Sequence, residues 1–196
     1  MHHITEEEYR ASEEVSIDKH EWRDGMIYVM EIGSYNHTTI CGNVACAAHN
    51  ALRDKPCRVH PSAQRIKIES NGWEVYPDAV IFCPPWRFVG KGDSTLLTPK
   101  VVFEVLSKST QSYDRQCKFA LYKTIETLEE YVLIDQNRIW IDHYRRSGDD
   151  WLHHSHNERS DNLKLPSVGI EIALDDIYDE LELPEALFGF EPVDEE

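Results

Sequence analysis

The sequence predicts an α+β protein with a mixed central β-sheet flanked by helices. Segments rich in β-branched residues, or alternating between apolar and polar residues, occur along much of the chain and indicate strands. Segments with helical spacing stand between them, but without the regular βαβ alternation of a parallel sheet. The length of 196 residues suits one domain. We expect a single domain over residues 1–196, with an N-terminal helix and hairpin over about 1–35 and an acidic C-terminal appendage over about 171–196.

The first elements have strong local signals. The segment ITEEEYRASEE predicts a short helix, because Thr5 can cap it and Glu8 completes a capping box. The pair Asp24-Gly25 in HEWRDGMIYVMEIG predicts a β-hairpin. From His37 to Arg53 an amphipathic helix is predicted by apolar residues at helical spacing, namely Ile40, Val44, Ala47, Ala48 and Ala51.

Strands dominate the middle of the chain. We expect two strands in CRVHPSAQRIKI and WEVYPDAVIFC, the second ending at Pro84-Pro85. A loop over about Trp86 to Thr98 leads to PKVVFEVLS, whose β-branched residues predict a central strand. The pattern from Thr110 to Thr124 is helical, and EYVLIDQNRIWIDHY predicts a second hairpin turning at Gln136-Asn137. After Arg145 the chain reads as peripheral, with a short strand and a short helix in LPSVGIEIALDDIYDEL.

Charge and composition limit the function only loosely. The formal net charge of -16 argues against a general nucleic-acid binder, which should be basic. The charge lies at the ends, however. Residues 171–196 hold 11 acidic residues and no Lys or Arg, residues 1–24 hold 8 acidic and 3 basic residues, and residues 25–170 hold 17 of each kind. The body of the protein is therefore neutral, and the total charge is a weak argument against a polyanionic substrate.

The remaining composition predicts a cytoplasmic protein with no membrane contact. No apolar run approaches the length of a membrane span, and the polar, acidic N-terminus does not resemble a signal peptide. An odd number of cysteines without a CxxC pair predicts no disulfide framework and no zinc site. We expect small buried apolar side chains at all five, Cys41, Cys46, Cys57, Cys83 and Cys117.

Two carboxylates lie in or beside apolar strands. Asp78 stands at the head of AVIFC, and Glu104 lies inside VVFEVLS. Burying an unpaired carboxylate is costly, and two neighbouring carboxylates repel each other. A hard divalent cation relieves both problems, and Mg²⁺ is commonly held by one or two carboxylates with waters and substrate phosphates. Such an ion polarises a phosphoryl group and supplies a nucleophilic water for phosphodiester hydrolysis.

A lysine on the next helix can complete such a site. Asp114 and Lys118 are four residues apart and share a helix face. Lys118 can lean back toward the Glu104 strand, where it would orient the attacking water or stabilise charge on the phosphate.

Each of these residues also has a structural interpretation. Asp78 can be a turn residue that caps a strand end, and Glu104 can face solvent on an edge strand. Lys118 can be a surface lysine paired with Asp114. His37 can contact a phosphate or cap a helix, and we favour the cap. We interpret the polar cluster His153, His154 and His156 as solvated, and Tyr122 as a core residue.

Several segments together carry a family resemblance. They are HEWRDGMIYVM, the Asn36-His37 pair, PCRV, YPDAVIFC, VVFEVLSKSTQSYDRQCKFALY and EYVLIDQ. In order and spacing they resemble the Uma2 family of bacterial restriction endonucleases, within the PD-(D/E)XK nuclease superfamily. The resemblance covers nearly the whole chain and implies a restriction-endonuclease-like core.

The resemblance assigns roles residue by residue. Asp78 matches the acidic residue of the PD element, and Glu104 matches that of the (D/E)XK element. This element reads Glu104-Val105-Leu106, so its lysine is missing, and Lys118 matches the position from which the family supplies it. Glu21 matches an acidic residue near the start of the family's first hairpin, which implies an extra metal ligand or a water-positioning group. The backbone carbonyl of Val105 is implied as a further metal ligand.

The function implied is a Mg²⁺- or Mn²⁺-dependent endonuclease that hydrolyses DNA, with a homodimer as the arrangement that lets two sites cut two strands. Two alternatives stay open. The neutral body and acidic ends also fit a catalytically weak or inactive nuclease fold that serves as a binding or regulatory module. The lack of a basic stripe also fits a metal-dependent hydrolase of small phosphorylated substrates.

Overall fold

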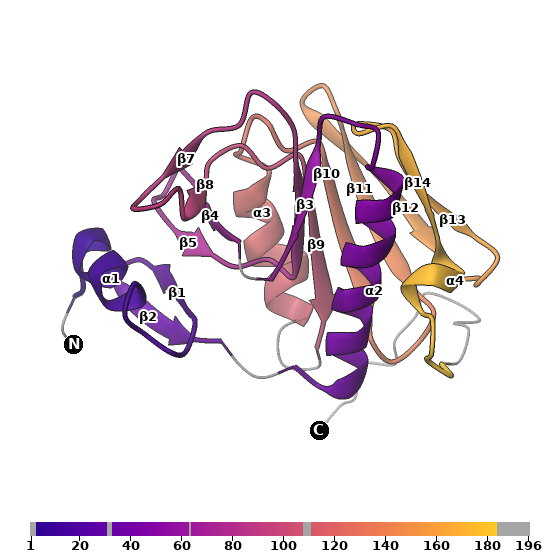
Figure 1. The fold of residues 1–196 in the computed structure, drawn as a ribbon, viewed down its shortest axis with the longest axis horizontal. Helices are drawn as coiled ribbons and strands as arrows, with labels where there is room; N and C mark the ends of the chain where they lie inside the picture. The colour runs from indigo at the N-terminus through magenta and orange to yellow at the C-terminus, as the bar shows by residue number, and fades with distance from the viewer. Residues whose placement is uncertain (1–2, 31–32, 63, 108–110, 184–196) are drawn as a thin grey trace.

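A mixed six-stranded sheet forms the centre of the molecule, which confirms the predicted α+β class (Figure 1). The computed structural model describes residues 3–30, 33–62, 64–107 and 111–183. The strand order of this sheet is β12-β11-β10-β9-β6-β3, and only β9 and β10 run parallel. Its strands are β3 (Arg58–Pro61), β6 (Ala79–Phe82), β9 (Val101–Leu106), β10 (Glu130–Asp135), β11 (Ile141–Ser147) and β12 (Asp150–His156).

One face of the central sheet is covered by α2 (Tyr35–Ala51), as the helical spacing predicted (Figure 1). Beside α2 lie a hairpin of β13 (Asn162–Leu165) and β14 (Ile170–Ala173), and then α4 (Leu174–Ile177). The prediction that the chain becomes peripheral after Arg145 is wrong, because β12 extends the sheet and the following segments complete its core. The core side chains of this part of the chain are Leu163, Leu165, Val168, Ile170, Ile172, Leu174, Ile177, Tyr178 and Leu181.

The other face of the central sheet carries a π-helical segment η1 (Tyr113–Lys118) that continues into α3 (Phe119–Tyr122). Side chains of β9 alternate between the two faces, so Val101, Phe103 and Val105 pack toward α2, and Val102 and Leu106 pack toward α3. By the same alternation Glu104 belongs to the α3 face. The predicted helix therefore forms, although its first residue, Thr110, and residues 184–196 of the predicted acidic appendage lie outside the described residues.

A second six-stranded sheet, in the order β2-β1-β5-β4-β8-β7, packs near α3. It consists of β1 (His20–Arg23), β2 (Met26–Val29), β4 (Arg65–Lys67), β5 (Glu74–Val75), β7 (Phe88–Val89) and β8 (Thr95–Leu96). The predicted hairpin is the antiparallel pair β1–β2, and Asp24 and Gly25 take positive φ angles of 48° and 76° at its turn. The predicted capping box is present at the start of α1 (Glu6–Glu13).

The two strands predicted in the middle of the chain are four strands, which corrects the sequence interpretation. The first predicted strand divides into β3 of the central sheet and β4 of the second sheet, and the second divides into β5 of the second sheet and β6 of the central sheet. Pro61 and Pro77 stand at these breaks, where a residue without an N–H group cannot donate to a strand ladder. The predicted loop from Trp86 to Thr98 also contains a strand pair, β7–β8. Asp78 lies at the bend, directly before β6.

A disulfide links Cys57 and Cys83, so the prediction that all cysteines are unbridged is wrong for these two. Antiparallel pairing of β3 with β6 sets Arg58 opposite Phe82, and the next position along the ladder sets Cys57 opposite Cys83. The sequence does not reveal this pairing, because the two cysteines are 26 residues apart. Cys41, Cys46 and Cys117 are free thiols, as expected, but the expected burial is wrong for Cys46 and Cys117, which are exposed, and Cys41 is only partly buried. Within the described ranges, no helix combines the length and apolar character that a bilayer crossing needs.

Candidate active site

All five residues predicted for the site line one cleft of about 560 Å³. Four structural elements contribute them. Glu21 comes from β1, Asp78 from the bend before β6, Glu104 and Val105 from β9, and Lys118 from the last turn of η1. The cleft therefore forms where the two sheets meet η1 and the N-terminal end of α2.

Lys118 is the centre of a buried ionic cluster. Its Nζ atom lies 2.8 Å from Glu104 Oε1, 3.4 Å from Glu21 Oε1 and 3.9 Å from Asp114 Oδ1. Only 6% of the Lys118 side chain is exposed, so the interpretation of a surface lysine is wrong. The hydroxyl of Tyr122 donates a hydrogen bond of 3.1 Å to Glu104 Oε1, so this core tyrosine also holds a site carboxylate in place.

Asp78 and Glu104 occupy opposite positions on neighbouring strands. Ala79 of β6 pairs with Phe103 of β9, so one step further along the antiparallel ladder Asp78 faces Glu104. The Val105 N–H group donates a 2.7 Å hydrogen bond to Asp78 Oδ2. Glu104 is 4% exposed on a central strand, which excludes the solvent-facing edge position. The register of β6 against β9 and this hydrogen bond thus bring both predicted carboxylates to one region of the cleft.

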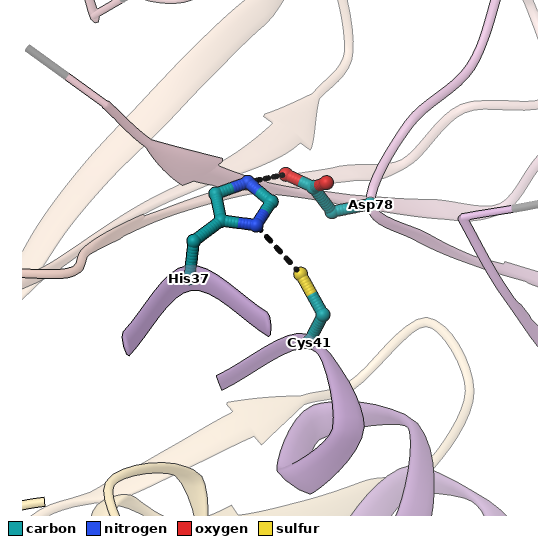
Figure 2. Close-up of side chains that lie close together, drawn as sticks. All are labelled: His37, Cys41 and Asp78. Carbon is teal, nitrogen blue, oxygen red and sulfur yellow. Dashed lines mark hydrogen bonds and ion pairs between the residues drawn. The ribbon is translucent and has the colours of Figure 1, made fainter. Parts of the chain in front are cut away.

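His37 has a different role from the predicted helix cap. The capping residue of α2 is Ser34, whose side-chain oxygen accepts a hydrogen bond of 3.2 Å from the His37 N–H group. The imidazole instead turns toward the site, with Nε2 3.3 Å from Asp78 Oδ2 and Nδ1 3.5 Å from Cys41 Sγ (Figure 2). The hydrogen bond to Asp78 raises the pKa of His37, against the opposing effect of burial.

The cluster has an excess of negative charge. Burial raises the pKa of Glu104 well above its usual value, Lys118 opposes this rise, and Asp114 and Asp78 add to it. Burial alone would lower the pKa of Lys118, but Glu104, Glu21 and Asp114 raise it instead, so this ammonium group stays charged. Among the described residues that line the cleft, four carboxylates (Glu21, Asp78, Glu104 and Asp114) outnumber the two cations Lys118 and Arg23, so the cluster favours the uptake of a proton or of a further cation.

Arg23 and Tyr28, which the sequence interpretation did not single out, lie at the same cleft, together with Tyr113 of the Lys118 helix. The Arg23 guanidinium carbon is 3.7 Å from the Tyr28 ring centroid and 4.6 Å from that of Tyr113, and Arg23 Nε is 3.6 Å from Glu21 Oε2. Strand alternation could have indicated Arg23 from the sequence, because residues 21 and 23 of one strand point to the same face as each other.

The histidines of β12 do not belong to this site. They line a separate cavity of about 650 Å³ together with His143, Asp161 and Glu171. His153 and His154 are exposed, as predicted, but His156 is only 8% exposed, so its interpretation as solvated is wrong. Burial, aided by His154 and His143, lowers the pKa of His156 to about 4.

A mixed sheet with carboxylates on adjacent strands and a lysine from the flanking helix defines a protein of the restriction-endonuclease-like fold class. A crystal structure described as a "putative nuclease belonging to DUF820", from Anabaena variabilis, shares this fold. Its TM-score is 0.65 at 15% identity, with 83% of this chain and 90% of the other covered.

The chain belongs to the Uma2 family, described as "Putative restriction endonuclease", whose model matches residues 6–175. Two uncharacterized proteins of Synechocystis are relatives. The protein slr1290 is 36% identical over 176 residues, covering 89% of this chain and 91% of its own length. The protein sll1609 is 31% identical over 150 residues, covering 76% and 85%.

Proposed function

We propose that this protein is a metal-dependent endonuclease that hydrolyses phosphodiester bonds in DNA with a metal-activated water. The observation that carries the proposal is the contact of 2.8 Å between Lys118 Nζ and Glu104 Oε1, inside a cleft that Asp78 and Glu21 also line. Membership of the family described as "Putative restriction endonuclease", and a fold shared with the structure described as a "putative nuclease", support the same conclusion.

The donor atoms fit a hard divalent cation, either Mg²⁺ or Mn²⁺. In this proposal the ligands are the carboxylates of Asp78 and Glu104 and the backbone carbonyl of Val105, all of which are oxygen donors. The raised pKa of Glu104 supports a cation here, because a divalent ion would replace the proton that the excess negative charge attracts. When bound, the ion would polarise the phosphoryl group and lower the pKa of a coordinated water.

The other residues position and balance the reacting groups. Lys118 is buried and charged, so its ammonium group can donate to a phosphate oxygen and stabilise the negative charge that develops there. Glu21 lies 3.4 Å from Lys118 Nζ and accepts a hydrogen bond of 3.2 Å from the Tyr76 N–H group, so it holds the ammonium group in position. Tyr122 fixes the orientation of Glu104 from behind.

Cleavage of supercoiled plasmid DNA with Mg²⁺ or Mn²⁺ tests the proposal. We expect nicked and linear products from the wild-type protein and none from E104Q. The matched control is E130Q, because Glu130 is an equally buried glutamate on the adjacent strand β10 and pairs with His143 outside the cleft. E130Q should therefore cleave at temperatures where it stays folded. Wild-type protein that leaves the plasmid intact with both metals, or E104Q that cleaves it, would contradict the proposal.

We also propose that DNA is cut by a homodimer, because cutting both strands of a duplex at one place requires two sites. Light scattering coupled to gel filtration measures the mass directly, against 22.8 kDa for one chain. A parallel assay with nucleotides addresses the small-substrate alternative, since hydrolysis of nucleotides without plasmid cleavage would favour it.

A further inference from the structure

Three different kinds of metal ligand gather at the N-terminal end of α2, beside the proposed nuclease site. His37 and Cys41 lie four residues apart on this helix and therefore project from the same face. Asp78 reaches them from the bend before β6 (Figure 2). An imidazole nitrogen, the Cys41 sulfur and a carboxylate oxygen of Asp78 all lie within 4.8 Å of one another.

These distances are close to those of a coordinated ion. Zinc–ligand bonds of roughly 2.0–2.3 Å in a tetrahedron place neighbouring ligand atoms about 3.5 Å apart. The structure has 3.3 Å between His37 Nε2 and Asp78 Oδ2, and 3.5 Å between His37 Nδ1 and Cys41 Sγ. The two contacts use opposite nitrogens of the ring, so binding of one ion through a single nitrogen requires a rotation of the imidazole or of the thiol, over the short distances that separate the three groups.

We propose that His37, Cys41 and Asp78 form a second cation site, specific for Zn²⁺ or a similar transition metal. Thiolate and imidazole are ligands of zinc, cobalt and related ions, whereas Mg²⁺ prefers oxygen donors alone. The site therefore differs in metal preference from the all-oxygen site of Asp78, Glu104 and Val105. Three protein ligands leave the fourth tetrahedral position for a solvent molecule or a substrate oxygen.

The same three residues also stand in the order of a thiol nucleophile, a base and an orienting carboxylate. The state of the thiol argues against that chemistry. Burial, with the nearby charge of Asp78, raises the pKa of Cys41 far above its usual range, whereas a nucleophilic cysteine needs a lowered pKa. A bound metal ion removes this barrier, because coordination deprotonates the thiol.

Asp78 is shared, so the two cation sites are coupled. This consequence rests on the proposed function, in which Asp78 is a ligand of the catalytic Mg²⁺. A transition metal held by His37 and Cys41 draws Asp78 away from that role, and we expect Zn²⁺ to inhibit Mg²⁺-dependent cleavage. Asp78 Oδ2 already accepts from the Val105 N–H group, so a change at Asp78 is transmitted directly to the strand that carries Glu104.

Cobalt absorption tests the site without any assay of activity. Co²⁺ added to the protein gives a thiolate-to-cobalt charge-transfer band in the near ultraviolet only if a cysteine is a ligand. The measurement uses the C46S/C117S double variant, in which Cys41 is the one remaining free thiol because Cys57 and Cys83 are bridged. We expect a saturable band, which Zn²⁺ removes by competition. Because Asp78 is shared, Mg²⁺ should raise the Co²⁺ concentration needed for saturation without abolishing the band.

Variants in the same background identify the ligands. C41S should abolish the band, and H37Q should weaken Co²⁺ binding by about ten-fold or more, since even the loss of an outer hydrogen-bond partner has such an effect. E104Q should keep the band, because Glu104 belongs to the other cation site. Absence of a band in C46S/C117S overturns the proposal, as does a band that persists in folded C41S or disappears in folded E104Q.

The failure of this inference is distinguishable from the failure of the nuclease proposal. If no DNA is cut but the cobalt band appears and depends on Cys41, the second cation site stands and the proposed activity is wrong. If DNA is cut but no band forms, the activity stands and the second site is wrong. In a cleaving protein, C41S should also resist Zn²⁺ concentrations that inhibit the C46S/C117S background, and equal inhibition of both contradicts the coupling.

Discussion

At the scale of single residues, Lys118 is the group on which the charge balance of the cleft depends. It lies within 4 Å of the carboxylates of Glu104, Glu21 and Asp114, and it is almost completely buried. Replacing it with methionine keeps the volume but leaves the carboxylates without their cation. We expect K118M to lose about 3–5 kcal/mol of unfolding free energy, the range for breaking a buried ion pair. Protonation of Glu104 will relieve part of this loss.

Thermal unfolding with and without Mn²⁺ checks this prediction. A divalent ion replaces the missing positive charge, so Mn²⁺ should raise the melting temperature of K118M more than that of the wild-type protein. K123M is the matched control, because Lys123 follows the same helix but is exposed, and its stability and metal response should stay near wild type. Equal stabilisation of K118M and K123M by Mn²⁺ would contradict the prediction that the ion takes over the charge of Lys118.

The buried His156, which lies outside the cleft, should make the unfolding free energy depend on pH. Its folded-state pKa of about 4 lies below the usual 6.5, because burial and the neighbours His154 and His143 disfavour the charged form, while Asp161 opposes them. Between these two values the unfolded chain binds a proton that the folded chain does not. The unfolding free energy should therefore fall as the pH drops from about 6.5 to about 4, by up to about 3 kcal/mol from this residue.

Urea unfolding at a series of pH values measures that loss. H156F should be about as stable as wild type at pH 7, because His156 Nε2 is buried without a hydrogen-bond partner in the described part of the chain. Below pH 6.5 the variant should lose less stability than wild type. Parallel pH curves for the two proteins would mean that His156 is not held neutral.

At the scale of elements, the ribbon of β3–β4 and β5–β6 connects the two sheets, and the Cys57–Cys83 disulfide ties its two strands together. Closing a loop of 26 residues should let the disulfide stabilise the folded protein by about 3–4 kcal/mol. C57A/C83A should lose about this much in urea unfolding, and reductant should bring the wild-type protein down to the same level without affecting the variant.

A count of reactive thiols tests directly whether the Cys57–Cys83 disulfide exists. Under non-reducing denaturation the wild-type protein should show three reactive thiols, and a count of five would contradict the disulfide. Because disulfides are rare in cytosolic proteins, the same count on protein taken directly from its cells also bears on the prediction of a cytoplasmic location.

The sequence predicts those elements whose signals are local. The capping box of Thr5 and Glu8, the Asp24-Gly25 turn and the spacing along α2 each depend on residues a few positions apart. The split of the predicted strands, the disulfide and the turn of His37 toward Asp78 depend instead on which strands pair. Residues near each other in sequence do not encode that choice.

The candidate site shows the same division. Asp78 and Glu104 are conspicuous in sequence because each carboxylate accompanies an apolar strand. Lys118 is indicated mainly by its match to a family position, since its spacing from Asp114 equally fits a surface pair. The π-helical turn that ends at Lys118, and the register that sets Asp78 opposite Glu104, are visible only in the assembled fold.

At the scale of the whole molecule, charge is separated between the body and the ends. Residues 25–170 carry equal numbers of acidic and basic residues, and among the described residues that line the cleft the Lys and Arg side chains are Arg23 and Lys118, so we expect DNA binding there to rely on a few cations. Each phosphate that a cation neutralises adds about -0.9 to the slope of log K against log salt. We therefore expect a shallow slope for this protein, of a few units.

A substitution of Arg23 tests this prediction of a shallow salt slope. Arg23 lies at the cleft, over the rings of Tyr28 and Tyr113, where its guanidinium group can contact a phosphate. R23Q should weaken the binding of different duplexes about equally and reduce the salt slope by about one. Fluorescence polarisation with a labelled duplex measures the slope, and an E104Q background prevents cleavage during the titration.

R53Q is the matched control for the same measurement. Arg53 is exposed just past the C-terminal end of α2, whereas His37 at the other end borders the cleft. A helix of 17 residues separates the two ends by about 25 Å, so Arg53 lies beyond the reach of a phosphate bound at Lys118. Its loss should leave the slope unchanged. If R23Q keeps the wild-type slope while R53Q reduces it, DNA approaches the α2 C-terminal end instead, and the cleft does not bind the duplex.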